Sequence, residues 1–160
     1  MDQALRSLWE VAGAWATEIP CVERINCHHN FTQKEHHHGK DVWLTRKGAI
    51  SARSGQRGVI PGSMGTASYI VRGLGSEASY QSCSHGAGRR LSRSAARKQL
   101  TVASLETAMQ GKVWNIDHAG ALLDEHPDSY KDIDQVMQDQ SDLVEIVHTL
   151  HQVFNYKGSE

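Results

Sequence analysis

The chain has 160 residues, of which 39% are hydrophobic and 22% charged, and its formal net charge is −1. This length corresponds to a single domain, and no apolar run approaches the roughly 20 residues that a membrane-spanning helix requires. The charge is unevenly placed, because residues 42–100 contain ten lysines and arginines against one acidic residue, Glu77. Such a block is typical either of a solvated basic face or of a surface that binds nucleic acid or a nucleotide.

The first half of the chain alternates between strand patterns and turn signals. Apolar residues recur at helical spacing within residues 2–16 and predict an amphipathic helix. The stretch CVERINCHHNF, residues 21–31, predicts a strand that runs into a turn at Asn30, and residues 41–53 predict two short strands with a bend at Gly48. Residues 58–75 predict a strand, a Pro-Gly turn and a second apolar strand from Ala67 to Leu74.

The second half contains more helical patterns. SRSAARKQL, residues 92–100, predicts a helix, and further helices are expected at 102–110 and within 129–140. The segment 143–156 is ambiguous, since its β-branched residues favour a strand while Leu143, Ile146, Val147 and Leu150 would also suit a helix. The mixture of elements predicts an α+β fold.

Two loops of small residues stand out. The first is IPGSMGTAS, residues 60–68, and the second is HGAG, residues 85–88, which RRLSR follows. Glycines let the backbone approach a ligand, and its N–H groups can then hold a phosphate, although the P-loop pattern G-x-x-x-x-G-K-[ST] is absent. Each loop taken alone is more typical of an ordinary turn than of a nucleotide site. Next to a bound phosphate, His85 could serve as a general acid, a metal ligand or a nucleophile.

Histidines and cysteines suggest metal binding only weakly. In CHHN, residues 27–30, adjacent histidines point in opposite directions along a strand, so at most one is expected to bind a metal ion. We interpret EHHHGKD, residues 35–41, as a solvated hairpin loop. Lys47 in TRKGA is either a phosphate contact or a member of a surface charge pair. The three cysteines, Cys21, Cys27 and Cys83, lack zinc-finger spacing and indicate a reduced, cytoplasmic protein.

Five motifs in this order resemble one family. NCHHNF, TRKGAISAR, IPGSMGTASYIVRG, CSHGAGRRLSR and the near-terminal YKG are similar to the C-terminal part of the RtcB-type RNA ligases, and YKDIDQVMQDQSDLVEIVHTLHQV extends the similarity. The motif region runs over residues 25–158. The resemblance implies that residues 1–160 form the C-terminal portion of an RtcB-like ligase domain with a mixed sheet-and-helix fold.

The resemblance also implies a reaction. Members of the family join an RNA 3′-phosphate, or a 2′,3′-cyclic phosphate that is opened first, to a 5′-hydroxyl end, and they use GTP and Mn²⁺. Under this resemblance His85 is the nucleophile that receives the guanylyl group, and His29 is a manganese ligand. The residues implied to contact the nucleotide are His29, Asn30, Lys47, Pro61, Gly62, Ser63, Met64, Ser68, His85, Gly86, Ala87, Gly88 and Lys157.

The other metal ligands of the family, an aspartate, a cysteine and further histidines, lie upstream of the matching region. The resemblance therefore implies a fragment that is impaired or inactive alone. Two alternatives remain: a non-catalytic remnant that binds RNA or a nucleotide, and one half of a split ligase whose N-terminal segment is supplied in trans. The expected partners are RNA and GTP, with no membrane.

Overall fold

A computed structural model describes residues 23–157, so the helix predicted at residues 2–16 lies outside the described residues. The strands are β1 (Asn30–His37), β2 (Lys40–Lys47), β3 (Ala49–Ser51), β4 (Arg57–Ile60), β5 (Ser68–Gly73), β6 (Ser82–Ser84), β7 (Val113–Trp114), β8 (Val144–Leu150) and β9 (Phe154–Asn155). The helices are α2 (Arg93–Gln99), α3 (Val102–Ala108) and α4 (Ile133–Asp139), with 3-10 turns η1 (Glu77–Ser79), η2 (Ile116–His118), η3 (Leu123–Glu125) and η4 (Pro127–Ser129). These elements confirm the α+β class. None of the helices within residues 23–157 is long and apolar enough to cross a membrane.

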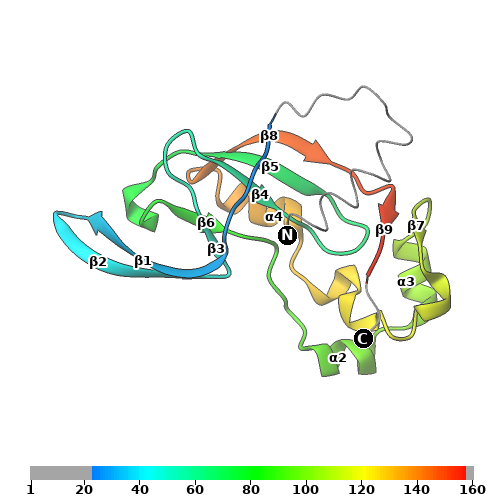
Figure 1. The fold of residues 1–160 in the computed structure, drawn as a ribbon. Helices are drawn as coiled ribbons and strands as arrows, with labels where there is room; N and C mark the ends of the chain where they lie inside the picture. Colours follow the sequence, from blue (N-terminus) through cyan, green and yellow to red (C-terminus); the bar gives the residue numbers. More distant parts are fainter. Residues whose placement is uncertain (1–22, 158–160) are drawn as a thin grey trace.

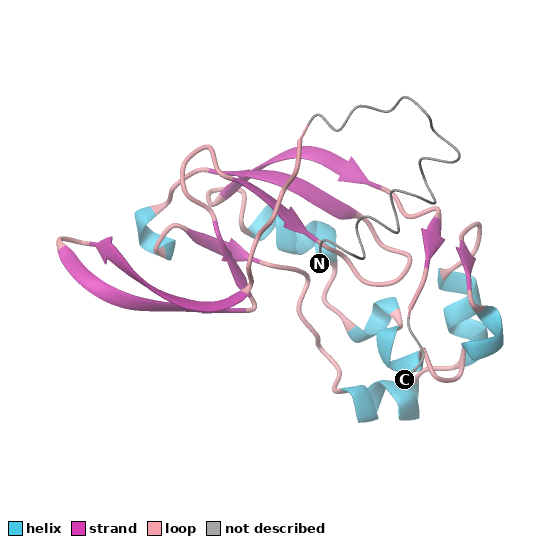
Figure 2. Cartoon of the chain, viewed as in Figure 1, coloured by secondary structure: helices cyan, strands magenta, loops and turns pink. Residues whose placement is uncertain are grey.

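A long hairpin forms one end of the molecule, and helices α2 and α3 lie at the other end (Figures 1 and 2). Strands β1 and β2 pair in antiparallel register from Asn30↔Lys47 to His37↔Lys40. The hairpin turns at His38 and Gly39, which both adopt positive φ angles, as tight hairpin turns require. The predicted strand before Asn30 and the predicted turn at Asn30 are therefore both wrong, because residues 23–29 form no strand and β1 begins at Asn30.

The hairpin interior holds a buried charge cluster, which consists of Glu35, His37 and Arg46. Both terminal nitrogens of Arg46 donate to the Glu35 carboxylate, and His37 Nε2 lies 2.8 Å from Glu35 Oε2. The Arg46 guanidinium holds the pKa of Glu35 well below its usual range, since it stabilises the charged form. The interpretation of residues 35–41 as a solvated loop is thus wrong for Glu35 and His37, which alternate inward along β1.

Three strands form the central sheet in the order β4-β5-β8. The ambiguous segment after residue 143 becomes a strand, because β8 finds a partner in β5. Ile60, Val71 and Val144 of this sheet join Ile133 and Met137 of α4 in the main core. Figure 1 shows α4 beside the sheet.

A second, smaller core lies at the helical end. Met64, Leu105 and Met109 are almost fully buried there, and Trp114 packs against them. The two predicted helices nearby are confirmed. Ser92 caps α2 by accepting from Ala95 N, and Thr101 caps α3 through a capping box with Ser104.

Candidate functional site

The imidazole rings of His29 and His85 stack on each other. Their centroids are 4.7 Å apart and their planes differ by 8°. The backbone of Gly48 lies between the two segments, since its N–H donates to His29 O at 3.0 Å and its carbonyl accepts from His85 N at 3.3 Å. His29 directly precedes β1 and His85 directly follows β6, so two residues 56 positions apart meet where these strands end.

Gly48 provides the backbone bend beside this pair. Its φ of +71° is a conformation that side chains disfavour, and a Cβ at this position would lie 3.7 Å from the His85 ring. The register of the hairpin places Lys47 directly opposite Asn30. Four residues that the resemblance assigns to the nucleotide, His29, Asn30, Lys47 and His85, therefore gather around one glycine.

The loop from Pro61 to Ser68 is folded tightly on itself. Gly62 N donates to Ser68 Oγ at 3.1 Å, and Ser63 N donates to Thr66 Oγ1 at 2.7 Å. A Cβ on Gly86 would lie 3.1 Å from Pro61 O, so the HGAG loop touches this loop directly. Both small-residue loops thus belong to one surface.

Two apolar residues assigned to the nucleotide have buried side chains. Met64 packs in the second core, and Ala87 packs in the main core. Their side chains secure the two loops, so only their backbone atoms are placed to contact a ligand.

Gln152 supports the first loop, and the sequence reasoning did not single it out. Its Nε2 donates to Ser63 O at 2.9 Å, and its Oε1 accepts from Gly65 N at 3.1 Å. Asn155 Nδ2 donates to the same Oε1 at 2.9 Å. Gln152 lies 89 residues from Ser63, and no local pattern in the sequence indicates such a pairing.

A polar network connects the HGAG loop to Lys157. Gly88 O accepts from Lys131 N at 3.0 Å, and Arg89 Nη1 donates to the Tyr130 hydroxyl at 2.8 Å. That hydroxyl donates to Glu125, which also pairs with Lys157 Nζ at 3.2 Å. Burial and the Glu125 carboxylate raise the pKa of Tyr130 to about 12, so it stays protonated as a donor.

A pocket of about 500 Å³ opens next to this network. Thr66 and Ala67 of the first loop line it together with Arg90, Tyr130, Lys131 and His151. Tyr130 and Glu125 were not assigned to the site from the sequence. The motif YKDID, which contributed to the resemblance, was the signal that could have indicated Tyr130.

A complete manganese site is not built by the described residues. Among residues 23–157, no three His, Cys, Asp or Glu side chains are grouped so that they could hold a metal ion. His29 can offer one imidazole nitrogen, and the Cys27 thiol lies 3.9 Å from Val59 O at the edge of the main core. The described residues therefore do not fit Mn²⁺ without ligands from elsewhere.

Comparison with known proteins matches the chain to one family. The profile of a family described as tRNA-splicing ligase RtcB matches residues 1–158. The RNA-splicing ligase RtcB of Escherichia coli K12 is 55% identical over 137 residues, which cover 86% of this chain and 33% of that protein. The tRNA-splicing ligase RtcB of Methanococcus maripaludis is 39% identical over 129 residues, covering 68% and 27%.

A more distant relative, the RNA-splicing ligase RtcB of Mycobacterium tuberculosis, is 30% identical over 142 residues, covering 77% of this chain and 33% of that protein. The chain thus spans about a quarter to a third of the length of these three curated relatives. The match extends over nearly all of its residues, and the chain belongs to the RtcB family of tRNA-splicing ligases.

Proposed function

We propose that this chain supplies the nucleophile and part of the nucleotide pocket of a GTP- and Mn²⁺-dependent RNA ligase. The ligase would join a 3′-phosphate or 2′,3′-cyclic phosphate end to a 5′-hydroxyl end. The stacking of His85 on His29 beside the two small-residue loops is the observation that best supports this function, in a chain that belongs to the RtcB family.

The chemistry follows from the properties of imidazole. A neutral ring nitrogen of His85 would attack the α-phosphorus of GTP, pyrophosphate would leave, and the ring would lose its proton. An oxygen of the RNA 3′-phosphate would then take the guanylyl group and restore His85. Attack by the RNA 5′-hydroxyl would finally form the phosphodiester and release GMP. The half-buried position of His85 is compatible with entry of a nucleotide.

The proposed reaction needs metal ligands in addition to His29. His29 would provide one ligand, and the others would come from a segment that corresponds to the upstream part of the longer relatives. That segment could be supplied in trans, as in a split ligase. A non-catalytic remnant would keep the basic surface and bind RNA without forming any adduct.

The test is guanylylation of the chain with labelled GTP and Mn²⁺, followed by a denaturing gel. We expect little or no adduct with the chain alone. Addition of the upstream part of the Escherichia coli relative should give an adduct that is acid-labile and alkali-stable, as expected for a phosphoramidate. His85→Ala should abolish the adduct, because the atom that would bond to phosphorus is removed.

His36→Ala is the matched control. His36 lies on the exposed face of the hairpin and contacts Asp41, whereas His37 is buried in the charge cluster and its removal would disturb the fold. Persistence of the adduct in His85→Ala would show that another residue is the nucleophile. Efficient ligation by the 160-residue chain alone would contradict the need for outside ligands.

RNA binding should depend strongly on salt and little on sequence. Arg90 and Lys98 are exposed basic residues near the HGAG loop and on α2. Their joint replacement by glutamine should reduce the slope of log affinity against log salt by about 1.4, because each phosphate contact on a single strand contributes about 0.7. Fluorescence anisotropy of a labelled oligoribonucleotide at several salt concentrations measures this slope, and an unchanged slope would exclude these two residues as phosphate contacts.

A further inference from the structure

A second pocket has a volume of about 370 Å³. It is lined by side chains from residues 26–33, around the start of β1, and from residues 51–56, at and after the end of β3. It combines an aromatic ring, three side-chain amides and two basic side chains. The ring is that of Phe31, the amides belong to Asn26, Gln33 and Gln56, and the basic side chains are His28 and Arg53. None of them is among the residues assigned above to GTP or to a metal.

Phe31 is held as a rigid platform at this pocket. The guanidinium carbon of Arg46 lies over the ring, 5.5 Å from its centroid, and the His28 ring meets it edge-on at 6.1 Å. Arg46 is itself fixed by the buried charge cluster. An aromatic face accepts any nucleobase by stacking, and Arg46 lies over only one of the two faces of Phe31.

Two of the amides can form hydrogen bonds with the polar edge of a base. The Gln33 NH₂ group donates to the Glu35 carboxylate at 2.5 Å, and the Gln56 carbonyl oxygen accepts from the Ser51 hydroxyl at 2.8 Å. The remaining halves, an acceptor on Gln33 and a donor on Gln56, complement each other. A base edge that carries a donor next to an acceptor matches such a pair.

Arg53 provides a cation that can move to a phosphate. Its side chain is 50% exposed, and its Nη2 lies 3.4 Å from Glu35 Oε2. Glu35 already has bonds from Arg46 and His37, so it does not depend on Arg53 for its neutralisation. The mouth of the pocket therefore offers a guanidinium to an incoming anion.

The pocket is one residue from the stacked histidines. His28 lines it, and His29, the next residue, stacks on His85. Consecutive residues are 3.8 Å apart along the backbone, so the pocket and the histidine pair are close neighbours along the chain.

We propose that this pocket binds one unpaired base of a single-stranded RNA, with Phe31 as the stacking surface and Arg53 as the contact to its phosphate. The assignment of the strand as the ligase substrate rests on the proposed function, whereas base binding itself does not.

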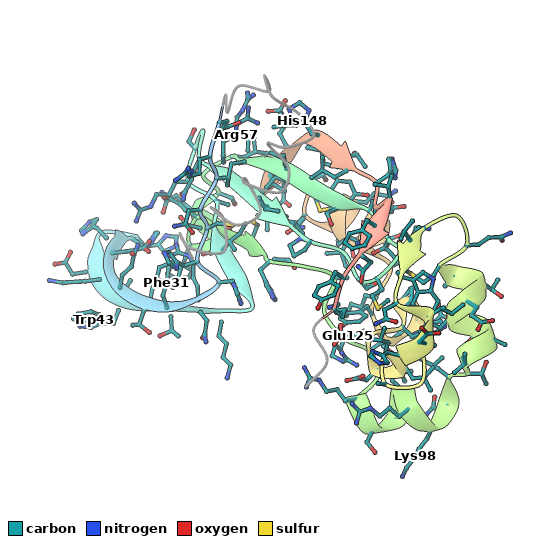
Figure 3. All side chains as sticks on the ribbon, turned by 45° about the vertical axis from the view of Figure 1, so that its right-hand side comes forward. Phe31, Trp43, Arg57, Lys98, Glu125 and His148 are labelled. Carbon is teal, nitrogen blue, oxygen red and sulfur yellow. The ribbon has the colours of Figure 1, made fainter. Side chains whose placement is uncertain are left out.

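The test uses the full chain without GTP or metal, and a fluorescein-labelled single-stranded RNA of ten nucleotides with a 3′-phosphate. Phe31→Leu should raise the Kd about five- to 150-fold, which is the usual contribution of one stacked base, and leave the salt slope unchanged. Arg53→Gln should also weaken binding but reduce the slope by about 0.7. Trp43→Leu is the matched control, because this aromatic side chain lies on the outer edge of the same hairpin and is 74% exposed (Figure 3). It should leave the Kd unchanged.

A scan of abasic positions identifies the base. One position should weaken binding to the original chain and remove the difference between that chain and Phe31→Leu. Phe31→Trp, which keeps an aromatic face, should retain that coupling. The proposal would be overturned if Phe31→Leu weakened RNA binding equally at every abasic position. It would also be overturned if Phe31→Leu had unchanged circular dichroism and unchanged affinity for the RNA. Displacement of the RNA by equimolar uridine monophosphate would also overturn it, because the site would then belong to a free nucleotide. Since neither GTP nor metal is present, failure of guanylylation leaves this result unaffected.

Discussion

Replacing Arg46 with methionine should lower the free energy of unfolding by about 3–5 kcal/mol, the usual cost of removing one partner from a buried ion pair. Arg46 is 2% exposed, and its guanidinium donates to Glu35, to Ser82 Oγ and to Tyr80 O. Its loss would leave the Glu35 carboxylate buried with too few donors and would free the start of β6. Because β6 leads directly into His85, the stacked pair should loosen as well.

Urea denaturation followed by circular dichroism measures this change. Lys34→Met is the control, since Lys34 pairs with Asp41 at 2.8 Å on the exposed face of the same hairpin and should change stability by less than about 1 kcal/mol. The double variant Glu35→Leu/Arg46→Met should recover much of the loss, because neither charge then remains buried. A single Arg46→Met variant as stable as the original chain would show that the cluster does not support the hairpin.

Gly62→Ala should open the loop that begins at Pro61. A Cβ at Gly62 would lie 2.0 Å from Ala67 O and 2.3 Å from Thr66 Oγ1, so the backbone must shift. We expect a loss of about 1–3 kcal/mol or more, which corresponds to a fall in Tm of roughly 2–4 °C for each kcal/mol in a chain of this size. The contact between Pro61 and Gly86 should be disturbed, and under the proposed function GTP binding should weaken with it.

Differential scanning calorimetry and equilibrium GTP binding test the two effects together. Gly120→Ala is the matched substitution, because a Cβ there meets nothing within 4 Å, and it should stay within about 0.5 kcal/mol of the original chain. If Gly62→Ala behaves like Gly120→Ala in both measurements, the tight loop is not required for either stability or nucleotide binding.

Local chemistry was sufficient to predict several elements. Ser92 and Thr101 precede α2 and α3 and cap them, so both helices could be expected from the sequence. Gly48 produces the predicted bend between β2 and β3, with a φ of +71°. In each case a residue and its immediate neighbours determine the conformation.

Features that depend on distant partners could not be predicted in this way. Asn30 is a common turn residue, yet Lys47 across the hairpin draws it into a strand. Glu35 and His37 lie in a charged segment that is typical of a solvated loop. Their burial becomes favourable because Arg46, from the partner strand, donates hydrogen bonds to Glu35. The segment after residue 143 is a strand because β5 provides an edge for it.

The candidate site shows the same division. The motifs indicated which residues to examine, but neither spacing nor composition could indicate that His29 would stack on His85. The supporting bonds of Gln152 and Tyr130 were likewise beyond the reach of local patterns, since they join residues 41 to 89 positions apart. The roles assigned to all of these residues in nucleotide binding, metal binding and catalysis, including those of His29 and His85, remain predictions.

The large sequence separation between Gln152 and the loop that it supports has a consequence during protein synthesis. A ribosome that adds about 5–20 residues per second makes Gln152 roughly 4 to 18 s after Ser63. Throughout that interval the nascent chain carries the loop at residues 61–68 without the side chain that holds Ser63 O and Gly65 N. The loop therefore reaches its final form only after Gln152 has been made, and under the proposed function nucleotide binding would wait for that residue.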